Sequence, residues 1–170
     1  MKKFTNKQLV LVKKCIGVGC ALVCLLLMFL NVFKYTSSSS LSSGSDITWG
    51  KGVSLYSFLF NGDLFVLDTT VLYLRDMFVY SYVVMWISFV LSLLSLIILV
   101  YGVFSKKNLF SKIGSIVLVV ALGLFITISF DSQVVSSITI KYLNVFTPVY
   151  IISVIISVLG LLSTVTLKDK

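Results

Sequence analysis

The sequence predicts an all-α membrane protein, a four-helix transmembrane bundle with a small extracellular β-sheet or hairpin formed by its outer loops. The first observation is composition, because 58% of the 170 residues are hydrophobic and only 12% are charged. A soluble domain of this length needs a more polar surface. The second observation is a set of four apolar segments, each of roughly the 20 residues that a helix needs to cross a bilayer. The third is an outer loop rich in β-branched and aromatic residues, which is typical of strands.

The four predicted spans cover residues 15–33, 78–104, 113–130 and 148–167. None of them contains a charged residue, which suits hydrocarbon, where an ionised side chain is costly. The fourth span has a local start signal, because Thr147 can cap a helix and Pro148 suits its first position. The first span has an alternative interpretation as a cleaved secretory signal, which would leave three spans.

Basic residues predict which side of the membrane each loop occupies. With four spans and a cytoplasmic N-terminus, ten of the 14 basic residues lie on the cytoplasmic side, as the positive-inside rule requires. A fifth span over residues 53–74 would break this pattern and would bury Asp63 and Asp68 at about 2.5–3.5 kcal/mol each. We therefore predict a multi-pass protein of the plasma membrane with both termini cytoplasmic. The ten cytoplasmic residues are Lys2, Lys3, Lys7, Lys13, Lys14, Lys106, Lys107, Lys112, Lys168 and Lys170.

The predicted loops are an outer loop at residues 34–77, an inner loop at 105–112 and a second outer loop at 131–147. The first outer loop opens with TSSSSLSSGSD, which is typical of a flexible linker. Further on, Asn61-Gly62 lies between two aromatic runs and predicts a β-hairpin over residues 58–67.

Alternating apolar and polar residues in ITIKY, at residues 138–142, predict another strand from the second outer loop. In an alternative interpretation, the aromatic residues of the first outer loop dip into the lipid headgroups. In both interpretations we expect this loop to supply an outer contact surface. The candidate residues are Trp49, Phe58, Phe60, Asn61, Gly62 and Phe65.

Small residues along each span predict how the helices pack, because membrane helices associate where small side chains allow close approach. An alternative is that the serines line a polar path, but no ionisable or amide residue accompanies them in the core of a predicted span. The predicted helix-packing residues are Gly17, Ala21, Ser88, Ser92, Ser95, Gly114, Ala121, Ser153, Ser157 and Gly160.

Residues that usually carry chemistry are scarce. The chain has no histidine and no glutamate, which removes common general bases and metal ligands. Its cysteines, Cys15, Cys20 and Cys24, all lie in the first span and are expected to be packing residues rather than disulfide partners. We predict no catalytic site, no metal and no cofactor. The lysines flank spans instead of forming a basic face, so we also predict no nucleic-acid partner.

The overall layout resembles that of the claudin-like group of four-span membrane proteins. The shared features are four spans, a long first outer loop with strand character, a very short inner loop and Arg75 just before the second span. The family's first outer loop carries a Trp, then G-L-W and two cysteines, whereas Trp49 is the only Trp of this loop and no cysteine lies in it. The resemblance implies a bundle carrying an extracellular sheet, in proteins of adhesion, of barriers or of channel assemblies.

Two functions from different classes fit this sequence. The first is a non-enzymatic membrane protein that acts through protein–protein or protein–lipid contacts, with the outer sheet as the contact surface. Its expected partners are membrane lipid, another membrane protein or a second copy of the chain. The alternative is a small oligomeric transporter or pore for an uncharged or lipidic solute.

Overall fold

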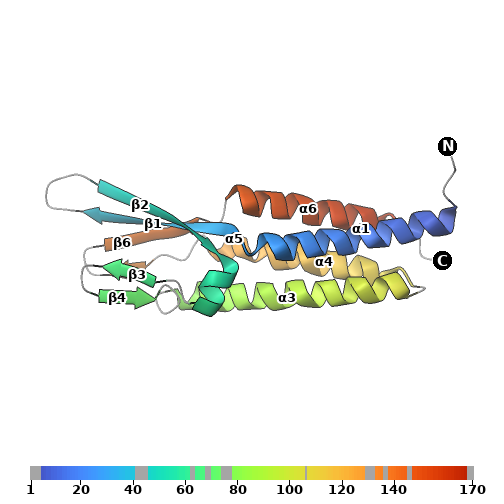
Figure 1. The fold of residues 1–170 in the computed structure, drawn as a ribbon, viewed down its shortest axis with the longest axis horizontal. Helices are drawn as coiled ribbons and strands as arrows, with labels where there is room; N and C mark the ends of the chain where they lie inside the picture. The colour runs from blue at the N-terminus through green and yellow to red at the C-terminus, as the bar shows by residue number, and fades with distance from the viewer. Residues whose placement is uncertain are drawn as a thin grey trace.

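The computed structural model describes residues 5–40, 46–61, 64–67, 70–73, 78–105, 107–128, 133–135, 138–144 and 147–167. Within them, the protein is an elongated helical bundle with β-structure gathered at one end (Figure 1). We call this the sheet end. At the opposite end, α1 begins, α3 is followed by α4, and α6 ends. We call that the lysine end because it holds Lys7, Lys13, Lys14, Lys107 and Lys112.

The structure confirms four helices that are long and apolar enough to cross a membrane. In the bundle, α1 packs against α3 and α6, and α4 packs against the same two helices on the other side, so the four form a closed ring. Helices that follow one another closely in the chain are antiparallel neighbours, as short connections require. The elements are α1 (Asn6–Leu27), α3 (Val79–Phe104), α4 (Leu109–Gly123) with its continuation α5 (Phe125–Ile128), and α6 (Pro148–Val165).

The first helix begins and ends earlier than the predicted span, residues 15–33. The side-chain Oε1 of Gln8 accepts a hydrogen bond from the backbone N–H of Thr5 at 3.0 Å, which caps the helix ahead of the lysines. At the other end the chain leaves the helix after Leu27, and Asn31 already pairs with Ser54 of strand β2. The apolar run therefore continues as a strand where it leaves the bundle.

The other helix boundaries lie closer to the prediction. Helix α3 begins at Val79, and α4 begins at Leu109, inside the predicted inner loop. The start of α6 confirms the expected cap, because the Thr147 hydroxyl accepts a hydrogen bond from the Tyr150 backbone N–H at 3.2 Å and Pro148 occupies the first turn.

Both loops at the sheet end contribute strands to one antiparallel sheet, in the order β2-β1-β6-β5. The predicted strand at residues 138–142 lies within β6 and pairs with β1. A separate two-stranded sheet joins β3 to β4. The strands are β1 (Asn31–Ser40), β2 (Asp46–Ser54), β3 (Leu64–Leu67), β4 (Thr70–Tyr73), β5 (Gln133–Val135) and β6 (Ile138–Asn144).

The serine-rich segment is not a linker over residues 36–40, because these residues belong to β1. They pair with β2 on one side, and residues 36–39 pair with β6 on the other. Backbone pairing on two sides outweighs the low intrinsic preference of such a segment for a strand. The remainder of the predicted linker, residues 41–45, lies outside the described residues.

The predicted hairpin over residues 58–67 is wrong at its first strand. Ser57–Asn61 forms η1, a single turn of π-helix, instead of an extended strand. Strand β3 begins only at Leu64, and its partner is β4. Gly62 lies outside the described residues.

Burial explains why a helical turn replaces the expected strand. The buried side chains are Leu55, Phe58 and Leu59, with exposed fractions of 1%, 0% and 3%. Their spacing of three and four residues places them on one helical face, whereas a strand would turn alternate residues inward. Tyr56 and Phe60 remain about half exposed on the opposite side. The apolar core extends from between the helices to these residues and to the base of β1 and β2.

Candidate functional sites at the two ends of the bundle

The ten small residues predicted to pack the helices are all buried in the bundle. Glycines bring two backbones together between α3 and α4. A Cβ added at Gly114 would lie 2.7 Å from Leu99 Cγ, and one added at Gly102 would lie 2.9 Å from the backbone nitrogen of Ser111. Real Cβ atoms do not approach other atoms so closely, so these helices pack more tightly than alanine would allow.

Three of the buried serines among these small residues donate their hydroxyls to backbone carbonyls within the bundle. Ser92 Oγ donates to the Ser88 carbonyl at 2.8 Å, and Ser95 Oγ donates across to the Gly114 carbonyl of α4 at 2.7 Å. On α6, Ser153 Oγ donates to its own helix in the same way. Among the described residues, the buried hydroxyls of Ser88 and Ser111 have no hydrogen-bond partner.

Lys14 is the most unusual residue of the lysine end, because only 4% of it is exposed. Its Nζ donates to the Gly102 carbonyl at 2.9 Å and to the Ser105 carbonyl at 2.8 Å. Helix α3 ends at Phe104, so these carbonyls belong to the turn that a helix leaves unpaired and that carries partial negative charge. Lys14 is therefore a cationic cap on the C-terminus of α3.

Lys13 performs a similar role on the other neighbour of α1. Its Nζ donates to Thr166 Oγ1 at 2.8 Å, and Thr166 is the C-terminal cap residue of α6. Two consecutive lysines thus fasten α1 to the ends of two helices. From the sequence, both lysines were expected only to flank a membrane span. The one sequence feature that places the C-terminal ends of α3 and α6 near them is the predicted alternation of helix direction across the membrane.

A polar node at the lysine end links the helices further. It consists of Lys14, Ser111, Ser115 and Thr164. Thr164 Oγ1 donates to Ser115 Oγ at 2.9 Å, and Ser115 Oγ donates to the Ser111 carbonyl at 3.1 Å. The nearby Gly17 makes room, because a Cβ there would meet Thr164 Cγ2 at 3.0 Å. Lys14 stands one residue before the first predicted span, residues 15–33, so the cores of the predicted spans hold no ionisable residue, but a buried ammonium does lie at the lysine end of the bundle.

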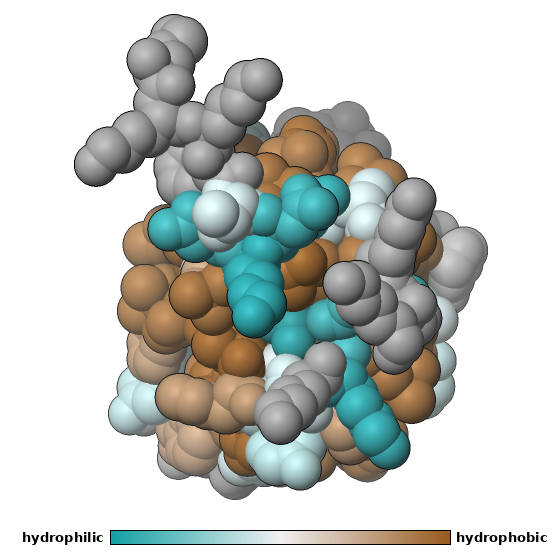
Figure 2. Space-filling model, turned by 90° about the vertical axis from the view of Figure 1, so that its right-hand side faces the viewer, coloured by the Kyte–Doolittle hydropathy of each residue, from teal (hydrophilic) through white to brown (hydrophobic). Residues whose placement is uncertain are grey.

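The node contains hydroxyls and one ammonium, so it can hold helices and bind water, but it has no carboxylate. Within the described part of the chain, no group of three or more His, Cys, Asp or Glu side chains could hold a metal ion. Cys15, Cys20 and Cys24 are free thiols, and Cys24 Sγ donates to the Ser153 carbonyl at 3.3 Å. Seen from the lysine end, hydrophilic residues cross the face of the bundle between apolar flanks (Figure 2).

At the sheet end, the helical segment over residues 55–61, which includes η1, fits between α1 and α3; we call it the wedge. The backbone N–H of Leu55 donates to the Met28 carbonyl at 3.1 Å, which attaches the wedge to the end of α1. Its outward rings join an aromatic cluster of Phe29, Tyr56, Phe60, Trp86 and Phe89. Ring centroids lie 5.4 Å apart for Phe29 and Tyr56, 4.9 Å for Tyr56 and Phe60, and 5.4 Å for Phe60 and Trp86.

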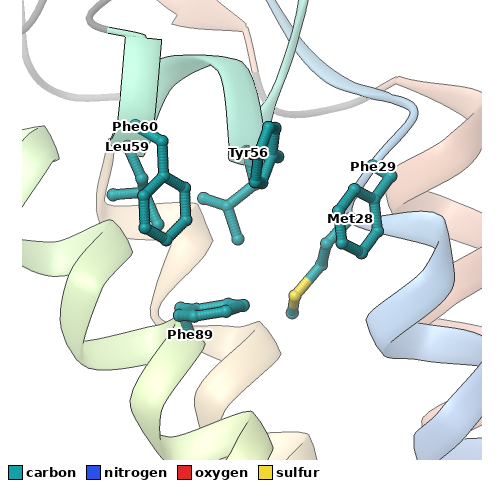
Figure 3. A pocket seen from close by; sticks show the side chains of 7 residues that line it. Met28, Phe29, Tyr56, Leu59, Phe60 and Phe89 are labelled. Carbon is teal, nitrogen blue, oxygen red and sulfur yellow. The ribbon is translucent and has the colours of Figure 1, made fainter.

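An apolar groove opens beside this wedge (Figure 3). Its floor is buried, and its walls are the partly exposed rings of the aromatic cluster. The groove is shallow: its enclosed part of ≈ 10 Å³ has room for about one water molecule, and the empty volume of ≈ 190 Å³ includes space that is open to the outside. The lining residues are Met28, Phe29, Leu55, Tyr56, Leu59, Phe60 and Phe89.

The predicted outer-surface residues divide into three groups. Phe58 is fully buried, with its ring centroid 6.1 Å from that of Tyr82, so it is a core residue and not a surface contact. Phe60 is 48% exposed and forms a wall of the groove. Trp49 lies in β2, Phe65 in β3 and Asn61 at the end of η1, where the structure describes the backbone.

Sequence reasoning missed Phe29 and Phe89 as members of this site, whereas Tyr56 is one of the loop aromatics that the alternative interpretation placed in the lipid headgroups. Phe29 and Phe89 lay inside predicted spans and carried no signal of their own. No protein-family model, curated protein or solved structure matches the chain. The claudin-like layout is therefore a resemblance of arrangement that no match supports.

Proposed function

We propose that this chain is a multi-pass membrane protein that acts through contacts with lipid and protein partners rather than through catalysis. The outward faces of its helices support insertion. On α3 these faces carry Val83, Ile87 and Val90, each about half exposed, and α6 carries Ile151 and Ile155 in the same way. Soluble monomers rarely expose apolar surface continuously around a bundle, whereas lipid tails match it.

The proposed orientation places the lysine end in the cytoplasm and the sheet outside. The lysines support this orientation, because five of the eight in the described residues lie at the lysine end, whereas Lys34, Lys51 and Lys141 lie in the strands at the sheet end. Cytoplasmic ends of membrane proteins are enriched in Lys and Arg. In this orientation both termini are cytoplasmic. The membrane that we propose is the plasma membrane.

One observation carries the contact function: two strands of the sheet continue directly from helices of the bundle and pair with each other. Strand β1 follows α1 after a short turn and pairs with β6, which leads into α6. The Thr147 hydroxyl strengthens this junction, because it donates to the Val32 carbonyl while it caps α6. A sheet held in this way presents a preformed surface, and a preformed surface loses less entropy on binding than a flexible loop does.

The transporter alternative receives less support. The seam hydroxyls of Ser92, Ser95 and Ser153 bond to backbone carbonyls. The large side chains of Leu99 and Leu118 are fully buried among the helices. A permeation path needs polar groups that face an open channel.

Photo-crosslinking in intact membranes tests the proposed contact surface. A photoreactive amino acid replaces Thr48 in the edge strand β2, and the matched control replaces Phe104, which is 84% exposed at the other end of the bundle. We expect a discrete adduct from the first variant and none from the second. Equal adducts from both positions, or solute flux through liposomes that contain only the purified protein, would contradict the proposal.

A further inference from the structure

We propose that the groove between η1, α1 and α3 binds the hydrocarbon tail of a membrane lipid. The inference rests on the membrane insertion proposed above and assigns a ligand class to one site on the protein. It concerns the apolar tail only, because the lining residues contain no charged or amide side chain.

The groove exists because α1 stops short at the sheet end. After Leu27 the chain turns and becomes β1, whereas α3 reaches up to Val79 at that end. The wedge fills only the inner part of the resulting gap, since Leu55 and Leu59 point into the core. The outer part is open below the row of rings formed by Phe60, Tyr56 and Phe29, with Phe89 beneath (Figure 3).

The chemistry of the groove fits hydrocarbon. Its floor is formed by the nearly fully buried side chains of Met28, Leu55 and Leu59. Its walls are aromatic rings, of which Phe29 and Phe60 are 56% and 48% exposed. Rings left half exposed gain free energy when a methylene chain covers them. The Tyr56 hydroxyl is the one polar side-chain group of the lining, and tyrosine is the residue type that prefers the boundary between tails and headgroups.

Continuity with the outer faces of α1 and α3 identifies lipid as the occupant. The residues that follow two of the lining rings are exposed as well: Leu30, next to Phe29, is 52% exposed, and Val90, next to Phe89, is 53% exposed. In the proposed membrane these side chains already contact lipid tails. A tail that lies along these side chains also meets the exposed rings of Phe29 and Phe60 from the open side of the groove.

A photoactivatable lipid with its reactive group in the acyl tail tests this inference. The full-length protein is reconstituted in vesicles of that lipid, illuminated and digested, and the labelled peptides are identified by mass spectrometry. Residues Ile151, Ile155 and Leu159 of α6 provide an internal reference, because they are 47–55% exposed and do not line the groove. We expect labelling of residues 55–60 and 86–89 to exceed labelling of α6 severalfold.

Two variants add a matched comparison. Phe60→Ala removes a wall of the groove, and Phe104→Ala removes an exposed ring at the lysine end. We expect Phe60→Ala to reduce the enrichment by about threefold to tenfold, which is the scale of one aromatic contact. Phe104→Ala leaves the enrichment unchanged.

The possible outcomes separate the two proposals. Equal labelling of the groove and of α6 would overturn the tail site while leaving membrane insertion intact. Labelling of α6 with none in the groove would also overturn it and would indicate that a protein surface, such as a second copy, covers the groove. Absence of labelling along the whole chain would contradict membrane insertion itself.

A second measurement uses Trp49→Phe, which leaves Trp86 as the single tryptophan. Lipids brominated in the tail should quench its fluorescence, and unquenched fluorescence would contradict the tail site.

Discussion

Replacing Lys14 by methionine tests whether its ammonium holds the bundle together. Methionine keeps a flexible apolar stem but removes the donors that bond the Gly102 carbonyl at 2.9 Å and the Ser105 carbonyl at 2.8 Å. Each hydrogen bond to a charged donor contributes about 1.5–3 kcal/mol. Because the variant also avoids the cost of burying an ammonium group, we expect a net loss of about 2–3 kcal/mol of unfolding free energy.

The assay is reversible unfolding in mixed detergent micelles, followed by circular dichroism as the fraction of denaturing detergent rises. Lys7→Met is the matched control, because Lys7 lies on the same helix with its side chain exposed. Exposed substitutions of this kind usually change stability by less than about 0.5 kcal/mol. Lys13→Met should fall between the two, since it removes one bond to the Thr166 hydroxyl. Equal midpoints for Lys14→Met and Lys7→Met would refute the capping argument.

Three further predictions follow from the same contacts. Gly102→Ala should destabilise the bundle by about 1–3 kcal/mol in that unfolding assay, because its Cβ would meet the Ser111 backbone. Gly19→Ala should leave the unfolding free energy unchanged or raise it, because nothing lies within 4 Å of a Cβ at that position. Equal changes in unfolding free energy for Gly102→Ala and Gly19→Ala would argue against the close contact between α3 and α4. Thr147→Val removes the cap of α6 and should lower the unfolding free energy by about 1–2 kcal/mol; unchanged stability would contradict its role. In a cysteine-free background, Thr48→Cys should react with a membrane-impermeant thiol reagent in intact cells and Asn108→Cys should not; the reverse pattern would overturn the orientation.

The sequence predicts those parts of the fold that depend on local properties. Four apolar runs predict four helices because a long apolar segment has few alternatives. The start of α6 is equally local, since Thr147 and Pro148 stand next to each other in the chain. The strand at residues 138–142 follows from its alternating pattern and lies within β6.

Features that depend on distant partners are the ones that sequence reasoning missed. Lys14 bonds to Gly102, 88 positions away, and no local pattern distinguishes such a cap from an ordinary flanking lysine. At η1, the Asn-Gly turn signal favoured a hairpin, whereas burial of Leu55, Phe58 and Leu59 selected one helical face. The polar strand β1 forms because it has neighbours on both sides, which its serines do not indicate.

The pairing of β1 with β6 has a consequence for how the chain is made. Ser37 pairs with Ile140, so the two central strands of the sheet come from opposite ends of the polypeptide. During synthesis, β1 and β2 can pair as soon as they emerge, but the other edge of β1 stays open until most of the chain has been translated. Open strand edges recruit other chains, so ribosome stalling before β6 would release a product prone to aggregation. The helical hairpin of α3 and α4, in contrast, is complete well before translation ends.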